Sequence, residues 1–116
     1  MFEIGEIAEQ DAATQMALLD LNNAHARETS YLSLRDWRML IGQAFIAKCI
    51  GADAFLIALD QDATYDNANF RWFRNSYDRF VYVDRIVVSA GLRGAGAAQA
   101  LYGDAIELAG KAGQER

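Results

Sequence analysis

The 116-residue sequence has no proline, one cysteine and one histidine. Because Cys49 is the single cysteine, an internal disulfide is excluded, and a lone thiol is typical of proteins in the reducing cytoplasm. His25 is the single histidine, so nothing else can complete a histidine metal site. We therefore expect no bound metal.

The chain also lacks a basic surface and a long apolar run. Its net charge is −5 at pH 7, whereas nucleic-acid-binding domains are usually basic. No run approaches the roughly 20 apolar residues that span a bilayer, and residues 1–6 lack the basic and apolar regions of a signal peptide. We therefore expect a cytoplasmic protein with no nucleic-acid or membrane partner, built as a single domain over residues 1–116.

The first half of the sequence predicts a strand, two helices and a hairpin. Residues 2–7 alternate weakly, and Asp11 is an N-cap candidate for a helix over 12–25. Ser33 is a second N-cap candidate, before a further helix. Two apolar runs joined by a short glycine-containing turn then predict a β-hairpin, with strands over 44–49 and 54–59.

The second half begins with a polar and aromatic segment over residues 60–78, which we interpret as a long loop. Residues 79–88 are dense in β-branched and aromatic side chains and predict a strand that is apolar on both faces except at Asp84 and Arg85. Helical spacing over residues 97–112 predicts a final helix.

A glycine-rich turn joins the last predicted strand to the last predicted helix. This arrangement directs free backbone N–H groups and the positive end of a helix dipole at one point, where an anion can bind. A P-loop requires Gly-Lys-Ser/Thr, but Gly96 is followed by two alanines. The dinucleotide-binding fingerprint requires a third glycine, where this sequence has Gln99. The acetyl-CoA loop Q/R-x-x-G-x-G/A is matched by Arg93, Gly96 and Ala98.

The order of elements strengthens this match. From Phe2 to Gly113 the sequence resembles the GNAT superfamily of N-acetyltransferases, in which a strand, two helices, a hairpin and a long strand precede the loop and its helix. Residues 82–88, Tyr-Val-Asp-Arg-Ile-Val-Val, followed by Leu-Arg-Gly-Ala-Gly at 92–96, are similar to the family's fourth strand and signature motif. The resemblance implies an α/β fold of three layers, with a mixed, mostly antiparallel sheet flanked by helices in the order β-α-α-β-β-β-α.

The resemblance also implies a function. The protein would transfer an acetyl group from acetyl-CoA to a primary amine of a small molecule or peptide, by direct attack of the amine on the thioester. The pyrophosphate would bind the N–H groups of residues 94–98, and the pantetheine arm would pair with the backbone of the strand, where an N–H near Ile86 polarises the thioester carbonyl. The implied cofactor-binding residues are Ile86, Val87, Val88, Arg93, Gly94, Ala95, Gly96, Ala97 and Ala98.

Two residues of the strand are candidate catalytic residues. Asp84 could serve as general base for the incoming ammonium, directly or through water. The alternative is a structural ion pair, because a charge buried in a strand requires a partner. Tyr82 shares a face with Asp84 by alternation and could line the acceptor site, and core packing is the alternative.

Four residues are candidates for binding the acceptor. Asn23 and His25 lie at the end of the first helix, in a connection that often forms a wall of the acceptor site in this family. Trp72 and Tyr77 could belong to an aromatic wall for an organic substrate. The alternatives are a surface histidine and an aromatic cluster that anchors the long segment.

Two rival functions remain open. The chain could be a catalytically inactive CoA-binding or protein-interaction module of the same fold, or a nucleotide-binding domain that shares only the glycine loop. Relative to the family, the sequence ends before the later strands that supply the general acid. Because this would leave the edge of strand 79–88 unpaired, we expect a homodimer that buries it.

Overall fold

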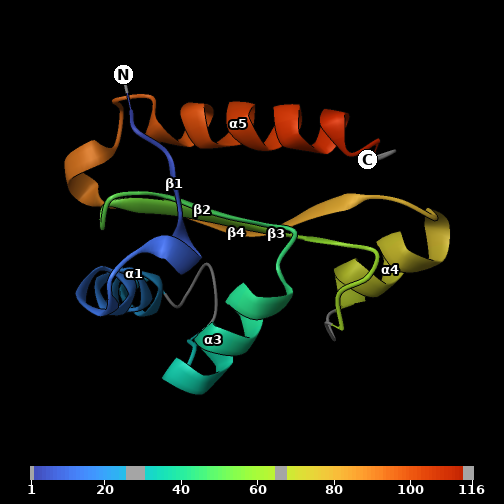
Figure 1. Cartoon of the computed structure of the whole chain (residues 1–116), viewed down its shortest axis with the longest axis horizontal. Coiled ribbons are helices and arrows are strands. Elements are labelled where there is room, and N and C mark those ends of the chain that lie inside the picture. Colours follow the sequence, from blue (N-terminus) through green and yellow to red (C-terminus); the bar gives the residue numbers. More distant parts are fainter. Residues whose placement is uncertain (1, 26–30, 65–67, 114–116) are drawn as a thin grey trace.

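The sheet is the centre of the structure. The computed structural model describes residues 2–25, 31–64 and 68–113. Within them a four-stranded antiparallel sheet has the order β1-β2-β3-β4. Helix α5 covers one face, and helices α1, α3 and α4 cover the other (Figure 1). The chain is therefore an α+β protein of three layers, and the expected mixed sheet is purely antiparallel within the described residues.

The first two helices begin at the predicted caps. Helix α1 (Ala12–Ala24) starts where the Asp11 carboxylate accepts the N–H of Thr14 at 2.8 Å. This backbone hydrogen bond lowers the pKa of Asp11. Helix α3 (Leu34–Gln43) starts where the Ser33 hydroxyl accepts the N–H of Asp36 at 3.1 Å. Both caps satisfy a helical N–H group that has no partner inside the helix.

The observed strands agree closely with the ranges predicted from the sequence, except at the N-terminus. The predicted hairpin is confirmed by β2 (Ile46–Ile50) and β3 (Ala54–Asp60), joined by a tight turn. Strand β1 is limited to Gly5–Glu6 and is followed by a 3₁₀ helix over Ile7–Glu9, so the first strand is shorter than expected. Strand β4 spans Val81–Val88 and pairs with β3.

The interpretation of residues 60–78 as a loop is wrong in its second half. Helix α4 occupies Ala68–Ser76. Phe70 is fully buried, and Phe73 and Tyr77 are partly buried against the same core cluster. These three aromatic residues have the spacing i, i+3 and i+7, which places them on one side of a helix. The burial of this aromatic stripe against the sheet stabilises a helix in a sequence that is otherwise polar.

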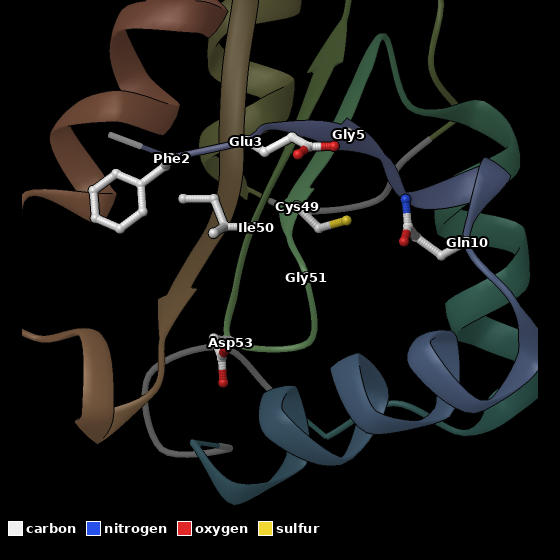
Figure 2. A pocket seen from close by; sticks show the side chains of 8 residues that line it. All are labelled: Phe2, Glu3, Gly5, Gln10, Cys49, Ile50, Gly51 and Asp53. Atoms are coloured by element: carbon white, nitrogen blue, oxygen red, sulfur yellow. The ribbon is translucent and has the colours of Figure 1, made fainter.

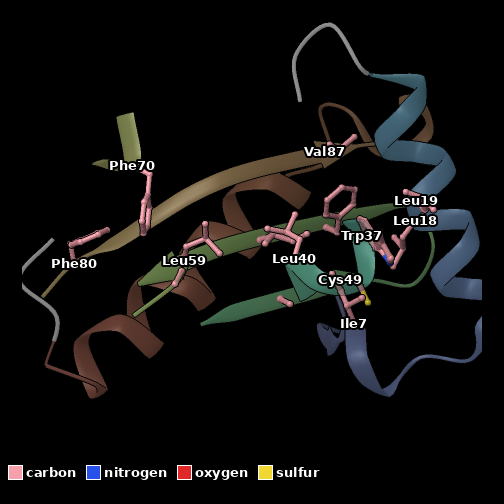
Figure 3. Packing of buried hydrophobic residues seen from close by; sticks show 14 residues of the cluster. Ile7, Leu18, Leu19, Trp37, Leu40, Cys49, Leu59, Phe70, Phe80 and Val87 are labelled. Carbon is pink, nitrogen blue, oxygen red and sulfur yellow. The ribbon is translucent and has the colours of Figure 1, made fainter. Parts of the chain in front are cut away.

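Two apolar clusters lie on opposite faces of the sheet. The larger one packs α1, α3 and α4 against alternate residues of the sheet (Figure 3). Within it, Trp37 and Phe55 are in edge-to-face contact at a centroid distance of 5.4 Å. The smaller one packs Leu101 and Ala105 of α5 (Ala97–Lys111) against the other face. Leu101, Ala105 and Leu108 are the apolar residues whose helical spacing predicts this helix from the sequence, and they form its buried side, with Leu108 partly buried.

Strand β4 contains a β-bulge. Ile57 of β3 lies opposite Arg85 and the next residue, Ala58, lies opposite Val83, so Asp84 has no partner on β3. Such a bulge inserts one residue into a strand and shifts the side chains beyond it to the other face.

The bulge ends the regular alternation of side chains that the sequence predicts for this strand. Strict alternation would place Tyr82, Ile86 and Val88 on one face. In the structure Tyr82 packs with the α1, α3 and α4 cluster, whereas Ile86 and Val88 pack toward α5. Arg85 lies on the α1 side of the sheet, where its guanidinium contacts Asn22 of α1.

The orientation of α4 gives a direct test of the corrected interpretation. Replacing the buried Phe70 with alanine leaves a cavity and should lower the free energy of unfolding by about 3–5 kcal/mol. Trp72, on the same helix, is 58% exposed, and its replacement with alanine should change stability much less. Urea denaturation measures both values, and equal losses would show that α4 does not pack as described.

Candidate functional site

The loop between β4 and α5 presents backbone N–H groups to solvent. Gly94 and Gly96 both have positive φ, at 80° and 89°, a conformation that favours glycine. Within this described loop, the N–H groups of Gly94, Gly96 and residues 97–99 have no hydrogen-bond acceptor, and the first helical bond runs from Ala100 to the carbonyl of Gly96 at 3.0 Å. The loop therefore combines free donors with the positive end of the α5 dipole.

A pocket of about 370 Å³ lies against these donors. It joins the end of β4 to the loop and the first turn of α5. Its walls are neutral except for Arg93, so an anion would meet donors and a positive charge, and no carboxylate. The lining residues are Val88, Arg93, Gly94, Gly96, Ala97, Ala98 and Gln99.

The edge of β4 that leads to this pocket also carries outward backbone groups. The N–H of Ser89 donates to the carbonyl of Asp53 at 2.7 Å, just beyond the last paired residues of β3 and β4. Hydrogen-bonded and non-hydrogen-bonded pairs alternate along an antiparallel ladder. The N–H and C=O groups of Val88 and Ile86 therefore point away from β3, along a sheet edge that no other described strand covers.

Arg93 connects the loop to the end of α1. Its Nη2 lies 2.8 Å from Nε2 of His25, and its Nε lies 3.4 Å from the carbonyl oxygen of Val88. Nδ1 of His25 lies 3.0 Å from the carbonyl oxygen of Leu21. Since a carbonyl only accepts and a guanidinium only donates, the contacts assign Nδ1 as the donor to Leu21 and Nε2 as the acceptor from Arg93.

The candidate base Asp84 lies in a buried ion pair. Its Oδ2 is 2.7 Å from Nε of Arg85, and the two side chains are 4% and 3% exposed. Nη1 of Arg85 donates to Oδ1 of Asn22 at 3.0 Å. Asn23 makes two hydrogen bonds to the backbone of Leu32, which hold together the segments flanking residues 26–30.

The aromatic candidates lie near the opposite end of β4. Tyr82 contacts the rings of Phe70 and Phe73 edge to face, each at a centroid distance of 5.8 Å. Tyr77 stacks on Phe73, and the exposed Trp72 packs against both. Tyr82 and Val88 are six strand positions apart, or about 20 Å. The structure therefore separates the aromatic candidates from the loop and connects them by the edge of β4.

The network at the end of α1 was partly missed by sequence reasoning. Asn22 is fully buried and Arg85 is 6% exposed, and neither was a candidate site residue. A signal for Asn22 was present, because it follows the buried Leu18 and Leu19 by four and three positions, on the apolar side of the helix.

A second pocket, of about 410 Å³, lies on the other side of the hairpin. It is formed by the N-terminal segment, β2 and the turn after β2 (Figure 2). Its ionisable groups are two exposed carboxylates, of Glu3 and Asp53, and the buried thiol of Cys49. It is larger than the pocket at the loop, but it has no comparable set of converging donors, so we place the candidate site at the loop.

The thiol in this second pocket should be unreactive. Burial raises the pKa of Cys49, which reduces the thiolate available for attack at neutral pH. We expect iodoacetamide to modify Cys49 slowly in the folded protein and rapidly in urea, as followed by mass spectrometry. Equally fast modification in both conditions would show that the thiol is accessible.

The described residues hold no group of three or more His, Cys, Asp or Glu side chains that could bind a metal ion. They also form no helix with the length and apolar character needed to cross a bilayer. In comparisons with known proteins, no family model matches the chain, and no curated protein or solved structure matches it significantly.

Proposed function

We propose that this protein is an N-acetyltransferase of the GNAT type, which transfers an acetyl group from acetyl-CoA to a primary amine. The observation that carries the proposal is the pocket at residues 93–99, where free N–H groups and a helix N-terminus meet the outward edge of β4. This combination suits a ligand with an anionic group at one end and an extended polar arm.

The loop is the proposed pyrophosphate site. The N–H groups of Gly94, Gly96 and the first turn of α5 would donate to phosphate oxygens, as helix N-termini do in other anion sites. Because Gly96 has no side chain, a phosphate group can come close to its backbone. The space that a Cβ atom would take there is nearly open, with only Oε1 of Gln99 within 4 Å, at 3.6 Å. Arg93 adds a positive charge at the wall of the pocket.

The edge of β4 is the proposed site of the pantetheine arm. The arm contains amide groups that can pair with the outward N–H and C=O groups of Val88 and Ile86, in the manner of an added strand. The N–H near Ile86 would polarise the thioester carbonyl, and fixed donors of this kind lower a barrier by about 3 kcal/mol. The neutral amine nitrogen forms a bond to the carbonyl carbon, the carbon–sulfur bond breaks and the thiolate leaves, and the proton that the nitrogen loses passes to the thiolate, directly or through water.

An arm that extends from the loop along β4 would end near Asp84 and Tyr82. We propose that the acceptor amine binds beyond this point, toward Trp72 and Tyr77. The exposed Trp72 and its aromatic neighbours offer a surface on which an organic acceptor can pack.

One observation favours an alternative, a CoA-binding module without catalytic activity. Asp84 is the candidate base, and its carboxylate is buried and paired with Arg85. A carboxylate that is buried and already paired does not present a free oxygen to an incoming amine. Acetyl-CoA turnover with a panel of amines separates the two proposals, because only the enzyme would release CoA at a rate that depends on the amine.

The glycine loop gives the decisive binding test. Gly96→Val should abolish CoA binding, because φ of 89° disfavours a β-branched side chain and the added methyl groups enter the proposed phosphate site. Gly91→Ala is the matched control, since Gly91 lies in the preceding 3₁₀ helix (Ala90–Leu92), its φ is not positive, and no atom lies within 4 Å of an added Cβ. Titration calorimetry should show parent-like CoA binding for Gly91→Ala.

Parent-like binding by Gly96→Val would refute the loop assignment. A thermal-shift panel of CoA, acetyl-CoA, NAD and ATP tests the ligand class, because a ligand that binds only the folded state raises the melting temperature. Stabilisation by NAD or ATP without stabilisation by CoA would refute the acetyltransferase proposal.

A further inference from the structure

The last turn of α1 contacts both halves of the proposed cofactor site. Asn22 contacts Arg85, which follows the bulge of β4, and His25 contacts Arg93 of the glycine loop. Residues three positions apart lie on the same side of a helix. One helix end therefore holds the strand and the loop at the same time.

The contact to the strand is buried. Asn22 is fully buried, and its Oδ1 accepts from Nη1 of Arg85 at 3.0 Å. Nδ2 of Asn22 donates to Oδ1 of Asn23 at 3.0 Å, so the amide is fixed from both ends. Because Arg85 also binds Asp84, the bulge and the helix end are parts of one polar network.

The contact to the loop, between His25 and Arg93, is exposed, and it requires an acceptor on the side of His25. Arg93 can only donate, so it requires the acceptor that Nε2 of His25 provides at 2.8 Å. Nδ1 of His25 is bonded to the carbonyl oxygen of Leu21, within α1 itself, and this sets the direction of the imidazole. The position of Arg93 is thus tied to the backbone of α1.

We propose that Asn22 and His25 are positioning residues, which set the spacing between the phosphate-binding loop and the outward edge of β4. The inference rests on the proposed function. CoA would bind both halves at once, so its affinity depends on their spacing, whereas inorganic pyrophosphate would need the loop alone. Misplacement of a binding group by about 1 Å can reduce a rate by as much as about a hundredfold, and binding across two sites is sensitive in the same way.

His25→Ala gives the main test, because this contact is exposed and its loss should not unfold the protein. We expect calorimetry to show CoA affinity reduced by about tenfold and pyrophosphate affinity reduced by less than about twofold. His25→Gln should restore most of the CoA affinity, because the glutamine carbonyl oxygen can accept from Arg93. Thermal denaturation of each variant checks that the fold is retained.

A double-mutant cycle shows whether His25 acts through Arg93. In the Arg93→Ala background, His25→Ala should have no further effect on CoA affinity, because the shared contact is already lost. An undiminished effect in that background would overturn the proposal.

Asn22 is tested by comparing two substitutions. Asn22→Asp keeps the acceptor for Arg85 but loses the donor to Asn23, so it should retain more CoA affinity than Asn22→Leu. Asn22→Leu removes the acceptor and should weaken CoA binding more than pyrophosphate binding. If Asn22→Leu does not fold, the His25 variants decide alone.

Three further results would overturn the inference. If the parent protein binds no CoA, the proposed function fails and the positioning role fails with it. If the parent binds CoA and His25→Ala binds it within about twofold of the parent, the proposed function stands and the positioning role is wrong. An equal loss of CoA and pyrophosphate affinity would show that His25 affects the loop alone.

Discussion

The burial of the Arg85 charge is the constraint on which much of this structure depends. A charge on an apolar face of a sheet costs several kcal/mol unless it is paired and hydrogen-bonded. Asp84 supplies the opposite charge and Asn22 the neutral acceptor. Neighbouring residues of a regular strand point to opposite faces, so the bulge at Asp84 is what allows the two charged side chains to meet. The polar pair therefore explains both the irregularity of β4 and the docking of α1.

The bulge has a second effect, on the backbone. It shifts the part of β4 that follows by one residue, so that Ile86 and Val88 turn their N–H and C=O groups to the outer edge and their side chains toward α5. Without the bulge, the N–H and C=O groups that point to the outer edge would be those of Arg85 and Val87. The arrangement of donors along the edge is thus coupled to the buried ion pair on the face.

The features that could be predicted from the sequence are those set by interactions between residues close together in the chain. Asp11 and Ser33 cap helices through N–H groups three residues away, and Gly96 precedes a helix with a clear apolar stripe. The helix around Phe70 was missed because its aromatic stripe is embedded in polar residues. The bulge at Asp84 and the contact of Asn22 with Arg85, 63 positions away in the sequence, could not be predicted, because no local pattern selects a strand register or a distant partner.

Helix α4 has a consequence for the order of folding. Strands β3 and β4 share the most extensive pairing in the sheet, and the chain between them runs from Gln61 to Phe80. Closing this connection costs entropy before the strands gain any contact. The edge-to-face contact of Phe70 with Phe80, at a centroid distance of 5.5 Å, bridges α4 and the start of β4 within ten residues. We infer that this local contact forms early and brings β4 to β3, so its loss would slow folding more than it speeds unfolding.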